Sequence, residues 1–181
     1  MRYLPTVTEV ISPFVDFSRI PPNVLQMAAD RGTSVHDVCL NFHAKGMPFV
    51  GEIQEDAKGY IESFDRWLDQ IVAEVLLVER RLFDEAHGFC GQIDLLVKTK
   101  QAEIWLPDLK TPLQKSRSWR VQMAAYLRLC NVAGYEPKRS GSLRLRKDGK
   151  VPMMDWYEES AAQDFNIFLS ALNCHRFFKA A

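Results

Sequence analysis

Residues 88–126 contain three segments that dictate how the chain folds: GFCGQID at 88–94, IWLPDLK at 104–110 and QMAAY at 122–126. The first two are apolar runs separated by a polar turn around Thr99-Lys100-Gln101, which predicts a β-hairpin. The third carries a glutamine and a tyrosine four residues apart, hence on one face of a helix. The hairpin therefore presents two aspartates and a lysine, and the helix presents two further polar side chains.

The remainder of the chain adds helices and strands on both sides of this hairpin. Apolar residues at three- and four-residue spacing indicate helices, and runs rich in Val and Leu between turn residues indicate strands. Asp148-Gly149 is a strong hairpin turn. We therefore expect an α/β domain with a mixed central β-sheet flanked by helices. The expected elements are helices at 23–31 and 33–42, the second capped by Thr33 or Ser34, a helix at 54–73, strands at 75–83, 89–97, 103–110, 142–146 and 151–157, and helices at 119–130 and 158–178.

The length and composition suit one domain spanning 1–181, because 181 residues that are 47% hydrophobic bury a full core and little more. Within it we distinguish a helical N-terminal part of about 21–73, a core of about 74–134 with the polar residues above, and a C-terminal hairpin and helix of about 140–179. Lys plus Arg equals Asp plus Glu, 23 each, so any affinity for a polyanion must come from local clustering.

The cysteines and the apolar runs bear on compartment. Cys39, Cys90, Cys130 and Cys174 are widely spaced and form no C-x-x-C pair, which favours free thiols over a zinc or iron–sulfur site. Free thiols fit the reducing cytoplasm. No run approaches the ~18 apolar residues of a membrane span, and residues 1–20 do not resemble a targeting signal. We expect a cytoplasmic protein with no membrane partner.

The two aspartates of the hairpin are candidates for one metal site. With the tip at Thr99 to Gln101, Asp94 faces Leu106, and Asp108 lies one pleat further along the same face, with Cβ atoms roughly 7–8 Å apart. Carboxylates at that separation can share a divalent cation. Strand alternation returns Lys110 to the same side.

Each feature alone has an ordinary structural explanation. Asp-x-Lys at a strand end is typical of a solvated edge, Gln122 and Tyr126 of a half-buried polar pair, and a lone His36 of a packed or solvated side chain. The apolar residues before Asp108 change this interpretation, because the strand then runs into the interior, where unpaired charge is costly. A divalent cation would supply the missing counter-charge.

Together the motifs resemble a known superfamily. Gly91-x-x-Asp94, Asp108-x-Lys110 and Gln122-x-x-x-Tyr126, preceded by Gly32-Thr33-x-x-His36, are similar to the PD-(D/E)XK nucleases, which have a restriction-endonuclease-like core. Within them the chain resembles the RecB-type branch that includes the CRISPR-associated and the mitochondrial genome maintenance exonucleases. The resemblance covers roughly residues 30–130, and Thr6 to Ile11 is similar to the opening of the mitochondrial-type members.

The resemblance implies a role for each matching residue. Lys110 would orient or help deprotonate the attacking water and stabilise the charge that develops on the phosphate. Gln122 and Tyr126 would position the nucleic acid or the site, and Glu79 would be a possible outer ligand. The implied ligands of Mg²⁺ or Mn²⁺ are His36, Asp94, Asp108 and the Leu109 carbonyl.

Departures from the family pattern narrow the comparison. The iron–sulfur subfamily needs one cysteine near the start and three near the end, whereas only Cys174 lies late here, so we expect no iron–sulfur cluster. Asp108 stands where many relatives have Glu, and no helicase motif accompanies the nuclease motifs.

Two basic groups are candidates for DNA contacts. The first, with an indole that could stack on a base, is Lys115, Arg117, Trp119 and Arg120; the second, more typical of a solvated face, is Arg144, Arg146, Lys147 and Lys150.

These observations predict a Mg²⁺- or Mn²⁺-dependent deoxyribonuclease, an exonuclease acting on single-stranded DNA or DNA ends, in a phage or bacterial repair or recombination setting. Two alternatives stay open. One is a structure-selective or sequence-specific endonuclease on the same core, and the other is a non-catalytic DNA-binding protein that keeps a relict site.

Overall fold

A computed structural model describes residues 3–16, 18, 20–111 and 115–179. Its centre is a five-stranded mixed sheet with the strands in sequence order, β1-β2-β3-β4-β5. Neighbours are antiparallel except β3 and β4, which run parallel and are connected through α4. The predicted α/β architecture, with a mixed sheet flanked by helices, is confirmed. The strands are β1 Val72–Asp84, β2 Phe89–Thr99, β3 Ile104–Lys110, β4 Arg139–Arg144 and β5 Met153–Trp156.

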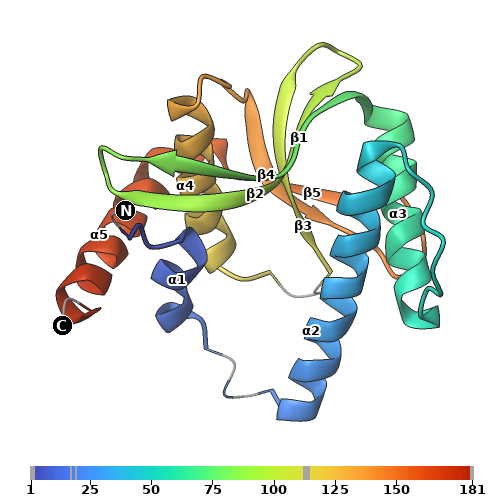
Figure 1. Ribbon diagram of the computed structural model, residues 1–181, viewed down its shortest axis with the longest axis horizontal. Helices are drawn as coiled ribbons and strands as arrows, with labels where there is room; N and C mark the ends of the chain where they lie inside the picture. The colour runs from blue at the N-terminus through green and yellow to red at the C-terminus, as the bar shows by residue number, and fades with distance from the viewer. Residues whose placement is uncertain (1–2, 17, 19, 112–114, 180–181) are drawn as a thin grey trace.

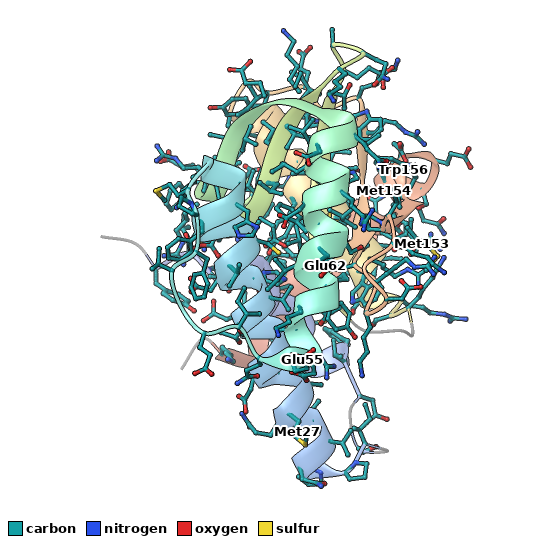
Figure 2. All side chains as sticks on the ribbon, turned by 90° about the vertical axis from the view of Figure 1, so that its right-hand side faces the viewer. Met27, Glu55, Glu62, Met153, Met154 and Trp156 are labelled. Atoms are coloured by element: carbon teal, nitrogen blue, oxygen red, sulfur yellow. The ribbon has the colours of Figure 1, made fainter. Side chains whose placement is uncertain are left out.

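Helices cover both faces of this sheet and enclose two apolar cores (Figure 1). On one face, α1, α4 and α5 pack around Ile93, Met123 and Phe168. On the other, α3 and the segment after α2 pack around Leu95, Phe64 and their neighbours. Figure 2 shows α3 lying across this second face, with Trp156 and Met154 of β5 to one side of it. The helices are α1 Val7–Ile11, α2 Pro22–His36, α3 Glu55–Ile71, α4 Ser118–Val132 and α5 Ala161–Lys179.

The path of α2 differs from the prediction. We expected one helix to stop at Gly32 and a second to be capped by Thr33 or Ser34, but α2 runs unbroken from Pro22 to His36. The Thr33 hydroxyl donates to the carbonyl of Ala29 at 3.0 Å, one turn back, instead of capping a new helix. The chain then continues as a π-helical segment, Asp37–Phe42. One glycine was therefore too weak a signal to end a helix that packs against its neighbours.

The thiols are free, as the spacing predicted. Cys39, Cys90 and Cys130 are buried, while Cys174 is exposed on α5. Burial raises the pKa of the Cys130 thiol to about 12, which makes it a poor nucleophile. None of the helices in the described part of the chain combines the length and the apolar character needed to cross a bilayer.

Candidate metal and phosphodiester site

The site begins where β2 and β3 separate. Their ladder pairs Lys98 with Ile104 and Val97 with Trp105, and the next positions hold Leu106 and Pro107. Because Pro107 has no N–H to donate, the ladder does not continue past it in the usual way. The Asp94 carboxylate fills the gap, accepting a hydrogen bond of 2.7 Å from the Leu109 amide.

The predicted register of this hairpin was wrong by two residues. The turn occupies Lys100 to Glu103 instead of Thr99 to Gln101, with the Thr99 amide donating to the Glu103 carbonyl. Extending the observed pairing places Asp94 opposite Asp108, whereas we had placed it opposite Leu106. A shift of two residues keeps every side chain on its face, so the two aspartates stay on the same side of the sheet.

The two carboxylates are close enough to perturb each other. The Asp94 side chain is 17% exposed and that of Asp108 3%. Burial, followed by the charge of Asp108, raises the pKa of Asp94 from 3.8 to about 6, although His36 and Lys110 act in the opposite direction. Two acids at one point of the interior therefore carry more negative charge than their surroundings neutralise.

Lys110 lies within this acidic environment. Its Nζ is 2.5 Å from Asp108 Oδ2 and 3.3 Å from Gln122 Oε1, to which it donates. Burial lowers the pKa of Lys110, but the charges of Asp108 and Asp94 outweigh burial and leave it raised. The amine is therefore held as a cation beside the acids. Despite this ion pair, none of the described residues gives the buried Asp108 Oδ2 a hydrogen bond of normal geometry.

His36 reaches the same point from the end of α2. Its Nε2 is 3.1 Å from the Leu109 carbonyl oxygen, and its Nδ1 is 3.9 Å from Asp94 Oδ2. We expected a separate helix starting at Thr33 to carry this imidazole. Instead it belongs to the last turn of the unbroken α2, just before the π-helical segment, and it lies against β3. π-Helical turns are frequent at functional sites.

Gln122 and Tyr126 extend the site along α4. The Gln122 amide accepts from Lys110 through Oε1 and donates to the Tyr126 hydroxyl at 3.1 Å. Burial and the charge of Asp108 raise the pKa of Tyr126, so the phenol stays protonated. The glycine of Gly91-x-x-Asp94 has a packing reason, because a Cβ there would lie 2.8 Å from the Tyr126 ring.

A cleft of about 530 Å³ opens onto the site beside His36, Leu109 and Lys110. Glu79 of β1 also lines it, and the pairing of Val78 with Leu95 and of Arg80 with Ile93 puts Glu79 across from Asp94. The backbone of Glu79 has φ of 44°, a left-handed conformation that is uncommon for a residue other than glycine and is enriched at functional sites. The sequence pattern gave no sign of this conformation.

The residues predicted to gather DNA are mostly engaged within the protein. Lys115 lies 2.5 Å from Asp155, and Arg120 donates twice to the buried Asp164. Trp119 is buried, with Lys110 Nζ 5.7 Å from its ring centre, a placement that does not fit base stacking. Arg117 is exposed and lines a different groove.

One residue near the site was missed from the sequence. Asp155 of β5 binds both Lys115 and Arg144, and it pairs in register with Ser142, which itself pairs with Asp108. This row of partners depends on the parallel pairing of β3 with β4. No local pattern in the sequence predicts that register.

The chemical types of the candidate ligand atoms suit a hard divalent cation. Two carboxylates, a main-chain carbonyl and an imidazole are ligands that Mg²⁺ and Mn²⁺ accept. In the structure, however, the described residues contain no group of three or more His, Cys, Asp or Glu side chains spaced as a preformed metal site. The candidate donor atoms instead contact one another, the Leu109 amide and Lys110.

The chain was compared with known proteins. It matches no protein-family model and no curated protein.

Proposed function

We propose that this protein is a Mg²⁺- or Mn²⁺-dependent deoxyribonuclease that hydrolyses phosphodiester bonds, acting as an exonuclease on single-stranded DNA or DNA ends. The observation that carries the proposal is the meeting of Asp94 and Asp108 beside Lys110, at the point where β2 and β3 separate. The resemblance of the motifs to RecB-type PD-(D/E)XK nucleases supports the same assignment.

The charge balance favours a cation at this point. Asp94 and Asp108 are largely buried, and burial, followed by the negative charge of Asp108, raises the pKa of Asp94 despite the nearby Lys110. A divalent ion bound by both carboxylates would lower that penalty, and Lys110 Nζ would then move from the Asp108 Oδ2 that it contacts at 2.5 Å. When bound, such an ion would lower the pKa of a water and stabilise charge on the phosphate.

The chain's own residues then have distinct tasks. Lys110 is a fixed cation that would hold the nucleophilic water and the scissile phosphate by hydrogen bonding. The Gln122 side chain accepts from the Lys110 amine through Oε1 and donates to the Tyr126 hydroxyl through Nε2. Tyr126 would thus hold Gln122 in place, and Gln122 would fix where Lys110 points. His36 would give up its contact with the Leu109 carbonyl when that oxygen is needed as a ligand.

A cleavage assay tests the proposal. End-labelled single- and double-stranded oligonucleotides are incubated with EDTA, Mg²⁺ or Mn²⁺, and the products are followed in time. We expect metal-dependent cleavage that Asp108→Asn and Lys110→Ala each reduce by at least about a thousandfold, with folding checked by circular dichroism. Asp69→Asn, on the exposed surface of α3, is the matched control. If Asp108→Asn and Lys110→Ala both cleave as fast as the unmodified protein, the assignment is refuted.

Two alternatives are separated by substrate and by metal. A circular single strand is cut by an endonuclease and resists an enzyme that needs an end. Two observations favour the non-catalytic alternative. The candidate ligands contact one another, and the described residues contain no preformed group of metal-ligating side chains. DNA binding without cleavage at any metal concentration would favour it.

A further inference from the structure

Helix α5 carries a second stripe of residues, without charge, that the fold leaves exposed. Its inner face, with Phe168 and Leu172, is buried in the core. Its outer face is exposed, and its residues recur at alternating spacings of four and three. That spacing is the one by which a helix presents a seam to another helix. We call this set the outer seam: Gln163, Ile167, Ser170, Cys174 and Phe177.

The outer seam shares two features with the centre of a protein–protein interface, the absence of charge and an exposed aromatic side chain. It contains no charged residue, although 25% of the chain is charged. Exposed fractions are 49% for Ile167, 77% for Phe177 and 80% for the adjacent Phe178. Depletion of charge together with aromatic residues distinguishes the centre of protein–protein interfaces from the remaining surface.

A groove of about 640 Å³ lies beside the seam, between α5, α4 and the segment after α1. Its lining is mixed: the apolar residues are Ile11, Phe14, Val121, Ile167 and Ala171, and the charged ones are Arg117, Arg120 and Asp164. Phe14 is itself 65% exposed. The groove runs along α5 from Gln163 to Cys174, whereas the two exposed phenylalanines are nearer its C-terminal end. That end lies at the periphery of the molecule, away from α2 and α3 (Figure 1).

We propose that the outer seam of α5 is a homodimer interface, in which two copies of α5 pack antiparallel across a two-fold axis. Phe177 is ten residues from Ile167, about 15 Å along a helix. With the axis near residue 172, Phe177 of each copy lies over Ile167 of the partner subunit and beside its groove. A two-fold axis requires such reciprocal contacts. Ser170 and Cys174 meet near the axis, where small side chains let the helices approach.

The exposed area fits a second copy as occupant. The exposed parts of Phe14, Ile167, Phe177 and Phe178 amount to roughly 540 Å² per copy, taking about 200 Å² for each whole side chain. A stable interface buries about 800 Å² per partner, of which roughly 450–520 Å² is apolar. The apolar area is therefore that of one standard interface, and the seam spacing calls for a helix, which α5 of another copy supplies.

Sedimentation over a concentration series measures the association. The unmodified chain should reach twice its mass of 20.8 kDa, and Ile167→Asp and Phe177→Asp should each weaken dimerisation by at least about tenfold. Val50→Asp is the matched control, because Val50 is 93% exposed elsewhere. Circular dichroism confirms folding of each variant. A chain that is monomeric at every concentration, or a dimer that either seam variant leaves intact, overturns the proposal.

Cys174 provides a second, geometric readout, because the other three thiols are buried. In the antiparallel pairing the two Cys174 residues are separated by roughly 6 Å along the helices and 8–10 Å across them, within reach of a short bis-maleimide. We expect cross-linked dimer with the unmodified chain, little with Ile167→Asp and none with Cys174→Ser. Failure to cross-link a chain that sediments as a dimer would overturn the antiparallel arrangement.

Discussion

Replacing Asp94 by Asn should make the metal-free protein more stable while abolishing cleavage. The Asn side chain keeps an oxygen that can accept from the Leu109 amide, so the hydrogen bond across the gap between β2 and β3 survives. What is lost is a negative charge that sits beside Asp108 in a largely buried position. The substitution therefore isolates the electrostatic cost of the site from its packing.

The magnitude follows from the pKa of Asp94, which burial and Asp108 raise from 3.8 to about 6. A carboxyl with a raised pKa binds its proton more tightly in the folded state, so it lowers the free energy of unfolding as the pH rises from about 4 through 6. The loss saturates above that range at about 3 kcal/mol, taking 1.36 kcal/mol for each tenfold change in acidity. Asp94→Asn should recover it at pH 8, which corresponds to roughly 6–12 °C in Tm.

Urea unfolding at pH 4.5, 6 and 8 in EDTA measures this difference. The unmodified protein should lose stability over that range relative to Asp94→Asn, and the two curves should converge at the acidic end. Asp69→Asn, exposed on α3, should follow the unmodified protein at every pH. If Asp94→Asn is no more stable than the unmodified protein at pH 8, the claim that the acid pair lacks counter-charge is wrong.

Three further substitutions, in α2 and α3, test the packing of these helices by thermal or urea unfolding. Gly59→Ala should lower the free energy of unfolding by about 3 kcal/mol or more, because the new Cβ would lie 1.8 Å from the Lys147 carbonyl; an unchanged stability would show that the loop is not held there. Gly32→Ala should raise it by about 0.5–1 kcal/mol, since α2 is continuous at Gly32 and a Cβ meets only an ordinary contact; a loss would contradict the unbroken helix. Ser63→Ala should cost about 1–3 kcal/mol, because the buried hydroxyl donates to the Lys150 carbonyl and accepts from the Arg146 amide; a neutral effect would mean that neither bond stabilises the fold.

Local sequence patterns predicted most elements of the fold. Runs rich in Val and Leu between turn residues placed β1, β2 and β3 to within a few residues, and the three- and four-residue spacing placed α3, α4 and α5. Gln122 and Tyr126 do lie on one face of α4 and contact each other, because the helix itself fixes a spacing of four, and Gln122 also contacts Lys110. Predictions of this kind succeed since they depend on neighbours in the chain.

Features that depend on distant segments were not predictable in the same way. The parallel pairing of β3 with β4, which aligns Asp108 with Ser142, is a tertiary choice. The two-residue error in the hairpin arose because turn length cannot be read from Thr99 to Glu103 alone. The continuity of α2 through Gly32 shows that one glycine lowers helix propensity without ending the helix. The missed helix α1 did have a local signal, since Thr6 and Glu9 form a capping box.

The central claim is that Asp94 and Asp108 together bind a divalent cation, and titration of the protein with Mn²⁺ by calorimetry measures this directly. We predict saturable binding to the unmodified chain that Asp108→Asn weakens by at least tenfold, and that Asp69→Asn leaves unchanged. Absence of binding at millimolar Mn²⁺, or equal binding by Asp108→Asn, would contradict the account.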